Sequence, residues 1–540
     1  DKVRELTAQV VSALTRRLPG GGTVHIEDIQ DQAELALMRA GEHKVARDYV
    51  LYREQRARER AQNQSAPEGP EEHQIRVTLS DGGTRPLDLE RMRRLVEEAC
   101  RDMNAVDGPA IIRETCRNLF DGVREADVSQ ALVMSARSMI EREPQYSQVA
   151  ARLLLDILRR EALFFLGMDV DVETQEDLRE HYADYLGAYV KQAGELELLD
   201  LRLAQFDLKR LGAALKPERD LQFTYLGLQT LYDRYFIHSA SGVRFELPQA
   251  FFMRVAMGLA INEIDREERA IEFYELLSSF DFMSSTPTLF NSGTLRPQLS
   301  SCYLTTVPDD LDGIYGAIKD NALLSKFAGG LGNDWTRVRG MGAHIKGTNG
   351  KSQGVVPFLK VANDTAVAVN QGGKRKGAVC AYLETWHIDI EEFLELRKNT
   401  GDDRRRTHDM NTANWVPDLF MKRVAEDTDW TLFSPDEAPD LHDLTGQAFE
   451  AAYAAYEEHA ARGELKVSKT IKAVDLWRKM LAMLFETGHP WIAFKDPCNL
   501  RYTNQHAGTV HSSNLCTEIT LHTNDQEIAV CNLGSVNLAA

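Results

Sequence analysis

The feature that most constrains the fold is an alternation of short apolar runs and helical segments that begins near residue 286. Runs such as SSCYLTT and GAVCAYLE have the length and composition of buried strands, and longer segments such as VDLWRKMLAMLFETG have helical spacing. This pattern is typical of parallel strands joined by crossover helices, since parallel neighbours need long connections. The sequence therefore predicts an α/β sheet or barrel over 286–540, with NLCTEITL and EIAVCNL as further strands.

The preceding half of the chain is predicted to be mainly helical and to hold several domains, because 540 residues exceed the usual size of one. Apolar residues recur at three- and four-residue spacings through 1–63. Residues 64–74 (QSAPEGPEEHQ) have the composition of a linker. Helices are expected through most of 75–163 and 164–285.

Two local patterns add detail to this division. IRVTLSDGGTRPLD predicts a short hairpin that turns at Asp81-Gly82-Gly83. The segments KVARDYVLYREQR (44–56) and QVAARLLLDILRR (148–160) resemble each other. They indicate either a repeated helical unit or two unrelated amphipathic helices.

Composition and charge exclude several classes of function. Lys and Arg number 63 against 82 Asp and Glu, and the net charge of −19 argues against nucleic acid as the main partner, because phosphate backbones need a broad basic surface. The sequence contains no run of about 18 uncharged apolar residues and no pattern of a signal peptide at its start. We therefore expect a cytoplasmic protein that does not contact membranes.

The cysteines are odd in number, scattered, and never spaced as CxxC, which argues against a disulfide framework and against a structural zinc site. A cysteine that matters is therefore expected to be catalytic. The seven are Cys100, Cys116, Cys302, Cys380, Cys498, Cys516 and Cys531.

The stretch SNLCTEI (513–519), taken as a strand, would place Asn514, Cys516 and Glu518 on one face, because side chains alternate in direction. A buried carboxylate raises the pKa of a neighbouring thiol, which does not suit a thiolate nucleophile. It suits a thiol that stays protonated or reacts as a sulfur radical, with Glu518 acting separately as a base. Spacing alone leaves open the simpler alternative of a buried cysteine beside a solvent-facing glutamate.

Two other cysteines, Cys302 and Cys531, lie in predicted strands that could converge at one end of a sheet, although sequence separation does not show that they meet. The serines before Cys302 and the threonines of TPT (286–288) could donate hydrogen bonds to a phosphate. A helix N-cap near Ser285 accounts for the TPT segment equally well.

Three glycine-rich loops follow, at 329–332, 340–354 and 370–378. The GKS within the second is not a P-loop, because Ile345 stands where that pattern requires glycine. NQGGKRKGA in the third suits a mobile loop that contacts polyphosphate or a base, or simply a solvated basic loop.

Several motifs occur in an order that resembles the catalytic (large, alpha) subunit of class I ribonucleotide reductase, over roughly residues 165–540. NLCTEI is similar to class I, whereas the cobalamin-dependent class typically has NPCGE. The motifs are SSCYL (300–304), AGGLG (328–332), GTNGKSQGVVPFLKV (347–361), QGGKRKGA (371–378), LETWHIDIEEFLELRKNTG (383–401), WVPDLFMKRV (415–424), SNLCTEI (513–519) and AVCNLGSVNL (529–538).

This resemblance implies a role for each residue of a catalytic set. Cys516 would carry the thiyl radical that removes the 3′-hydrogen of the ribose, and Glu518 would be the base on the 3′-hydroxyl. Asn514 would hydrogen-bond the substrate. Cys302 and Cys531 would be the thiol pair that reduces the 2′-carbon and becomes a disulfide.

The resemblance also implies residues for substrate and effector. Thr286 and Ser301 would contact the substrate phosphates, and Arg375 would be a cation on the substrate side of the loop. A specificity effector would bind at a separate site, and the loop would relay its identity. The implied effector-binding residues are Asp309, Arg339, Gln371, Gly372, Gly373 and Lys374.

For the fold, the resemblance implies ATP-cone domains, the first partial, at 1–63 and 75–163, a helical reductase domain at 164–285, and the first part of a ten-stranded α/β barrel at 286–540. The first cone lacks the hairpin that would carry the basic nucleotide motif. The second has VTLSDGGTRPLD there without a Lys-Arg pair. We expect the second cone to be largely structural.

The implied activity is the reduction of ribonucleoside diphosphates to 2′-deoxyribonucleotides by thiyl-radical chemistry, with ATP, dATP and other dNTPs as effectors. The radical would come from a metal-containing small (beta) subunit, so this chain would need no metal of its own. A homodimer of large subunits and thioredoxin or glutaredoxin as reductant are also implied. The sequence resembles a fragment, which is expected neither to turn over nor to close the barrel by itself.

Two other functions stay open at this point. A nucleotide-sensing regulatory protein would also use ATP-cones, but it would not need an ordered set of Cys302, Cys516, Glu518 and Cys531. A cobalamin-dependent reductase would need adenosylcobalamin and no partner subunit.

Overall fold

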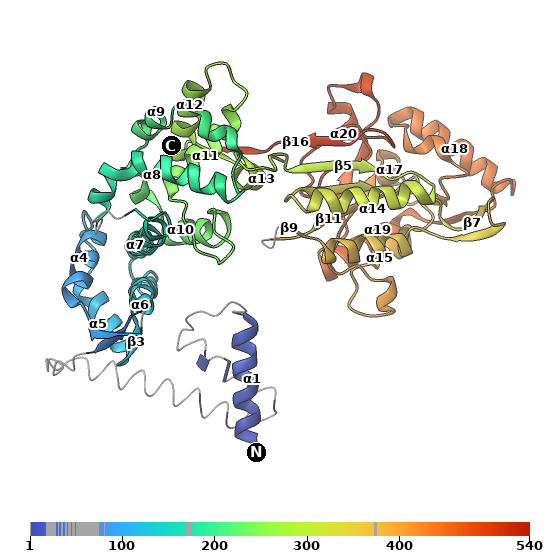
Figure 1. Ribbon diagram of the computed structural model, residues 1–540. Helices are drawn as coiled ribbons and strands as arrows, with labels where there is room; N and C mark the ends of the chain where they lie inside the picture. The colour runs from blue at the N-terminus through green and yellow to red at the C-terminus, as the bar shows by residue number, and fades with distance from the viewer. Residues whose placement is uncertain are drawn as a thin grey trace. The chain divides into compact units, whose positions relative to one another are not determined.

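The chain, seen here as a computed structural model, forms two compact units (Figure 1). The structure describes residues 2–17, 75–79, 82–168, 174–371 and 375–540, with isolated positions between 29 and 49. The first unit comprises residues 1–180, 217–233 and 243–245, and the second comprises 181–216, 234–242 and 246–540. The predicted linker 64–74 and most of 1–63 lie outside the described residues.

The first unit contains the predicted hairpin, which is confirmed. Strand β1 (Arg76–Thr78) pairs antiparallel with β2 (Thr84–Pro86) and parallel with β3 (Val123–Arg124). The helices that pack beside it begin at aspartate N-caps where the sequence offers them, because a carboxylate accepts from the exposed N–H groups of the first turn. Among the described residues, the helices of this unit are α1 (Lys2–Arg17), α4 (Leu89–Ala99), α5 (Gly108–Asn118), α6 (Glu125–Ser138), α7 (Tyr146–Phe165), the start of α8 (Gln175–Glu195), η3 (Pro217–Gln222) and α10 (Tyr225–Thr230).

The helical part of the second unit is built around α11 (Pro248–Ala260), which is apolar on nearly every side and buried along most of its length. It packs against α12 (Arg266–Ser278) and holds one buried ion pair, Arg254 with Glu246, at 2.7 Å. The other short elements are η2 (Leu201–Gln205), α9 (Leu208–Ala214), η4 (Leu231–Tyr235), β4 (Phe282–Ser284) and α13 (Thr286–Asn291).

The rest of the second unit is an α/β sheet, as predicted. Its six strands lie in the order β15-β12-β11-β6-β5-β16, and all neighbours are parallel except β16, which runs antiparallel to β5. The sheet is open and does not close into a barrel. The strands are β5 (Cys302–Thr306), β6 (Gly330–Asp334), β11 (Ala378–Glu384), β12 (Asn411–Val416), β15 (Trp491–Phe494) and β16 (Ala529–Cys531).

Crossover helices and small hairpins connect these strands. Residues 350–353 form a hairpin strand, in agreement with the rejection of a P-loop. The helices are α14 (Leu311–Ser325), α15 (Val356–Ala368), α16 (Ile390–Leu394), η5 (Asp403–Arg405), α17 (Asp418–Ala425), η6 (Pro439–His442), α18 (Gly446–Ala461), α19 (Ala473–Thr487), α20 (Lys495–Arg501) and η7 (Gln505–Ala507). The additional strands are β7 (Met341–Ile345), β8 (Gly350–Gln353), β9 (Asn370–Gln371), β10 (Arg375–Lys376), β13 (Asp429–Phe433), β14 (Ser468–Lys472) and β17 (Gly534–Val536).

Both faces of the sheet are buried, as its near-continuous apolar strands predict. On β11, Val379, Ala381 and Leu383 join the core on one face of the sheet. Cys380 and Tyr382 point the other way, into a smaller core that includes Val510 and Leu515. Within the part of the chain that the structure describes, no helix combines the length and the apolar character needed to cross a membrane.

One predicted strand is wrong. NLCTEITL is not part of any sheet: it turns at Leu515 and Cys516, and Thr517 has a positive φ of 69°. A Cβ at Gly332 of β6 would lie 2.0 Å from the carbonyl oxygen of Ser513, so the segment crosses the face of the sheet instead of joining it. The Asn514 side chain also takes the N–H groups of Glu518 and Ile519, which a strand would use for pairing.

Candidate active site

Cys302 and Cys531 lie opposite each other on adjacent antiparallel strands. Cys302 begins β5 and is paired in register with Cys531 at the end of β16. The N–H of Ser301 donates to the carbonyl oxygen of Cys531 at 2.9 Å, which joins the two strands at this point. Residues paired in this way have Cβ atoms about 4.5–5.5 Å apart. Both are reduced thiols here, and a small shift would bring them to disulfide distance.

The environment of this pair keeps both thiols protonated at neutral pH. Burial raises the pKa of Cys302 to about 12; the hydrogen bond from Asn514 opposes the increase and the Cys531 thiol adds to it. Burial also raises the pKa of Cys531, and the negative charge of Glu518 contributes. Such thiols are poor thiolate nucleophiles. They can still give up hydrogen atoms and form a disulfide.

Asn514 connects this pair to the turn that follows. Its side-chain Nδ2 donates to the Cys302 sulfur at 3.1 Å and to Glu518 Oε1 at 2.8 Å. Its Oδ1 accepts the N–H groups of Glu518 and Ile519, both at 3.1 Å. The residue is fully buried, so both ends of the amide are committed to protein partners.

Cys516 and Glu518 both project from this turn and are exposed. The expectation that they share a strand face with Asn514, and that a buried carboxylate adjoins the thiol, is therefore wrong. The turn nevertheless gathers the three residues, because Asn514 bonds Glu518 across it. The structure thus brings Asn514, Cys516 and Glu518 to the thiols at the amino end of β5.

The residues expected at substrate phosphates lie beside the same strands. The Ser301 hydroxyl donates to the hydroxyl of Ser285 at 2.5 Å, and Ser285 N–H donates to the carbonyl oxygen of Leu533. Thr286 begins α13, with Oγ1 2.9 Å from the hydroxyl of Tyr235. Ser285 is the N-cap residue of α13 but makes no side-chain capping bond, so its hydroxyl is directed to Ser301 instead.

Of the residues expected at the effector site, Asp309 and Arg339 lie at the other end of β5, whereas Gln371 precedes the amino end of β11, which is parallel to β6 and β5. Arg339 forms an ion pair with Asp309 at 2.9 Å, and its backbone N–H donates to the same carboxylate at 2.8 Å. The bond to Asp309 raises the pKa of Arg339. Gln371 and Arg375 face each other in the β9–β10 pairing. Of the loop between them, Gly372, Gly373 and Lys374 lie outside the described residues.

A charged cluster that sequence reasoning missed occupies the carboxyl ends of β6 and β11. Lys495 Nζ contacts both Glu384 carboxylate oxygens, at 2.8 and 3.0 Å, and both side chains are fully buried. His442 Nε2 lies 2.6 Å from Asp334 Oδ2, and the His442 ring stacks on that of His511 at 3.7 Å. These residues are separated by up to 177 positions in the chain, and no spacing pattern signals that they meet.

The protonation of this cluster follows from its burial. Burial favours an uncharged Asp334, but the charge and hydrogen bond of His442 dominate and hold the pKa of Asp334 at about 2. Burial and the charge of His442 lower the pKa of His511 to about 3. Asp334, His442 and His511 could each offer one atom to a metal ion. The parallel stacking of the two rings, at 14°, directs their nitrogen lone pairs side by side instead of toward a common point.

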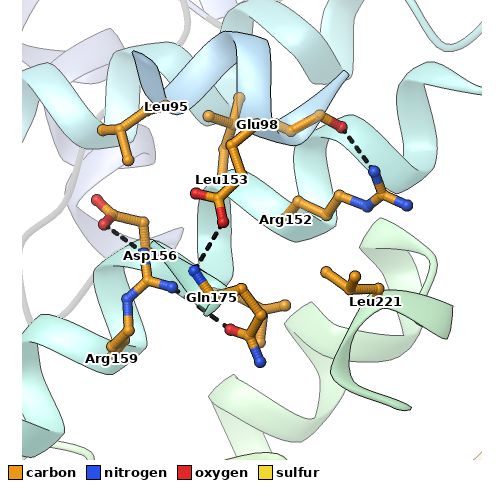
Figure 2. A pocket seen from close by; sticks show the side chains of 10 residues that line it. Leu95, Glu98, Arg152, Leu153, Asp156, Arg159, Gln175 and Leu221 are labelled. Atoms are coloured by element: carbon orange, nitrogen blue, oxygen red, sulfur yellow. Dashed lines mark hydrogen bonds and ion pairs between the residues drawn. The ribbon is translucent and has the colours of Figure 1, made fainter. Parts of the chain in front are cut away.

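The first unit contains a separate polar pocket between α4, α7 and α8 (Figure 2). Two of its charged side chains serve helix ends, while Asp156 and Arg159 form an ion pair with each other at 2.9 Å. Arg152 donates to the carbonyl oxygens of Ala99 and Arg101 at the end of α4, and Glu98 accepts the N–H of Gln175 at the start of α8, at 2.7 Å (Figure 2). The polar side chains of this pocket therefore hold the three helices together.

Comparison with known families agrees with this organisation. Three domain families match: the ATP cone domain at residues 1–58, the ribonucleotide reductase all-alpha domain at 221–297, and the ribonucleotide reductase barrel domain at 300–540. A mainly parallel α/β sheet that holds two cysteines opposite each other on adjacent strands defines the class of protein: an α/β enzyme domain with a pair of thiols. The chain belongs to the ribonucleotide reductase large-subunit family, which confirms the resemblance seen in the motifs.

Individual relatives extend the match over most of the chain. The chain is 52% identical over 543 residues to the ribonucleoside-diphosphate reductase subunit alpha of Chlamydia muridarum, covering 100% of this chain and 51% of that protein. It is 44% identical over 453 residues to the subunit alpha of Helicobacter pylori, covering 83% and 55%. It is 39% identical over 468 residues to the large subunit of Danio rerio, covering 86% and 57%. The chain thus spans about half the length of these relatives.

Proposed function

We propose that this chain carries the reducing thiols and the radical cysteine of a ribonucleoside-diphosphate reductase, which converts ribonucleoside diphosphates to 2′-deoxyribonucleoside diphosphates. The observation that carries the proposal is the pairing of Cys302 with Cys531, together with the Asn514 amide that joins Cys302 to Glu518. The names of the relatives support the same reaction.

The reaction balances with the groups present. The ribose C2′–OH bond breaks and a C2′–H bond forms, and the hydroxyl leaves as water. Cys302 and Cys531 supply the two hydrogens and two electrons as their S–H bonds are replaced by one S–S bond. The raised pKa values suit this role, because protonated thiols retain the hydrogen that must be transferred.

Cys516 would remove the 3′-hydrogen as a thiyl radical and return it at the end of the reaction. Its exposure on a turn supports this role, since substrate can reach the sulfur. Glu518 is exposed on the same turn and would take the proton of the 3′-hydroxyl. Asn514 would hold Glu518 toward Cys302, and its amide would contact the substrate when one of its present bonds to the protein opens.

Ser301 and Thr286 would bind the substrate phosphates. The adjacent Ser285 hydroxyl and the short distance from Ser301 to Cys531 support a position next to the thiols. Arg375 would approach the substrate from the loop that begins at Gln371.

Regulation would involve two further sites. A specificity effector would bind near Asp309 and Arg339 and act through Gln371, Gly372, Gly373 and Lys374, while ATP or dATP would bind the cone that matches residues 1–58. The unit at 75–163 would be a second, mainly structural cone, since Arg152 and Glu98 of its pocket bond to helix ends and Asp156 and Arg159 pair with each other.

The partners would be a second large subunit, a small subunit that supplies the radical from its metal centre, and thioredoxin or glutaredoxin, in the cytoplasm. Leu311, Tyr315 and Leu323 support the homodimer. They lie along one side of α14 at intervals of four and eight residues and are about half or more exposed, which is typical of a helix face that another subunit covers.

The test uses the full-length protein with its small subunit and a ribonucleoside diphosphate whose 3′-hydrogen is isotopically labelled. We expect the wild type to form deoxynucleotide. Cys302→Ser should still exchange the 3′-label, because abstraction uses a different sulfur, but should form no deoxynucleotide. Deoxynucleotide formation by Cys302→Ser at the wild-type rate would contradict the proposal.

A further inference from the structure

The geometry points to Tyr382 as a positioning residue for the turn that carries Asn514, Cys516 and Glu518. This inference rests on the proposed function, because it assigns Tyr382 the task of holding the groups that act on substrate. Tyr382 lies on β11 and belongs to none of the motif residues to which the family resemblance gives a role.

The contact that carries the inference is a single buried hydrogen bond. The Tyr382 hydroxyl donates to the main-chain carbonyl oxygen of Asn514 at 2.7 Å. The ring is fully buried and packs edge-to-face on Trp415, with centroids 6.1 Å apart at 81°. A ring held in this way has one direction in which to point its hydroxyl, so the sheet fixes the height of the Asn514 peptide above it.

The same residue, Asn514, makes most of the polar contacts that shape the turn; the Ser513 hydroxyl adds one, to the Ile519 carbonyl oxygen at 2.6 Å. Its side chain reaches Cys302 and Glu518, and it accepts two N–H groups from the far side of the turn. Because the main-chain bond orients the peptide from which this side chain grows, one hydroxyl on the sheet sets the direction of the amide. The direction of the amide then determines where Glu518 lies relative to Cys302.

A second feature of the sheet serves the same purpose. The main chain at Ser513 and Asn514 lies so close to β6 that a Cβ at Gly332 would be 2.0 Å from the Ser513 oxygen and 2.8 Å from the Asn514 Cα. Only glycine allows this approach. Gly332 sets how near the segment comes, and Tyr382 sets how its peptide is turned.

The chemistry of Tyr382 fits positioning and not catalysis. Its hydroxyl is bonded to a carbonyl oxygen, and its side chain has no exposed surface that substrate could reach. Burial raises the pKa of Tyr382 far above its usual value, and the nearby Cys380 thiol adds to the increase. The hydroxyl therefore keeps its proton and stays a donor at neutral pH.

The test compares Tyr382→Phe with a matched control in the full-length protein. Tyr453→Phe removes a bond of the same kind and one more, since the buried Tyr453 hydroxyl donates to the Thr431 carbonyl oxygen at 2.7 Å and accepts the Thr431 N–H at 2.6 Å, within the same unit. Two quantities are measured: kcat and KM for a ribonucleoside diphosphate with the small subunit present, and amide hydrogen exchange at Glu518 and Ile519.

We expect Tyr382→Phe to lower kcat about tenfold with KM changed less than about twofold, and to speed exchange at both amides about tenfold, the factor that loss of one buried hydrogen bond produces. Gly332→Ala should move both quantities in the same direction. Tyr453→Phe should change neither, although its melting temperature should fall by at least as much, because it loses two hydrogen bonds.

The inference would be overturned if Tyr382→Phe left amide hydrogen exchange at Glu518 and Ile519 unchanged. It would also be overturned if only one of the two quantities, the exchange rate or kcat, changed. An equal effect of Tyr453→Phe would overturn it as well. If the wild-type protein reduces no nucleotide, the proposed function fails by itself. The exchange measurement still decides whether Tyr382 holds the turn.

Discussion

The two ends of the parallel sheet bury polar groups in opposite ways. The amino end of β5 gathers uncharged thiols and an amide, with Glu518 left exposed. The carboxyl ends of β6 and β11 bury full charges, Glu384 with Lys495 and Asp334 with His442. Only two residues, Ser512 and Ser513, separate the His511 ring stacked in the charged cluster from the Asn514 amide bonded to Cys302.

This difference teaches how the domain can be both rigid and reactive. A buried charge must be paired, and pairing leaves it no freedom to act on a substrate. A thiol can be buried as a small uncharged group and still exchange hydrogen or form a disulfide. The charged end therefore serves as the anchor from which the reactive segment extends.

The largest effect should come from the reactive end. Cys516→Ser in the full-length protein should abolish both 3′-hydrogen exchange and turnover, a loss above about 10³-fold, because an O–H bond does not yield a radical as S–H does. The melting temperature should stay within about 1 °C, since the side chain is exposed. Cys116→Ser, in α5 of the first unit, is the control and should retain wild-type turnover.

The next largest effect should come from the buried charged cluster at the carboxyl ends of β6 and β11. Lys495→Met leaves Glu384 charged and unpaired in the interior, and should lower the free energy of unfolding by about 3–5 kcal/mol. Denaturant titration measures this loss. The double variant with Glu384→Gln should recover part of it, because the unpaired charge is gone. A loss below about 1 kcal/mol for Lys495→Met alone would show that the cluster does not anchor the sheet.

A smaller effect concerns pH. His511 has a folded pKa of about 3 against about 6.5 when unfolded, so between these values the unfolded chain binds the extra proton. Stability should therefore fall as the pH decreases from 6.5 toward 3, by up to about 1.4 kcal/mol per pH unit from this residue. His442, whose pKa is raised because Asp334 outweighs its burial, acts in the opposite sense and is stabilising below pH 6.5.

Melting temperatures across this range, for the wild type and His511→Asn, isolate the contribution of His511. The variant should lose less stability on acidification than the wild type. Parallel curves for the two proteins would mean that His511 is not held neutral by its surroundings.

The smallest effect should come from an ion pair at the surface of the same unit. Lys469 and Glu391 form a salt bridge, but both side chains are substantially exposed. Lys469→Met should change the free energy of unfolding by less than about 0.5 kcal/mol. If Lys469→Met lowered the free energy of unfolding as much as Lys495→Met does, burial would not explain why the Lys495–Glu384 pair stabilises the sheet.

Local pattern was sufficient for much of the fold. The alternation of apolar runs and helices predicted the parallel strands β5 and β11 and their crossovers, and the turn residues at 81–83 predicted the β1–β2 hairpin. Such features depend on neighbours a few positions apart. The prediction of a strand at NLCTEITL was wrong because it used the same local pattern. The apolar alternation is present, but the N–H groups of Glu518 and Ile519 bond to the Asn514 side chain instead of to a neighbouring strand.

By itself, the sequence determined the class of fold, the family and which cysteines deserved testing, because these depend on residue types and spacings along the chain. Only the tertiary structure decided that Cys302 stands opposite Cys531, that Glu518 is exposed, and that a hydroxyl on β11 holds Asn514. The physical reason is that these contacts join segments 132 to 229 residues apart. Their energies depend on burial and direction, which sequence spacing does not encode.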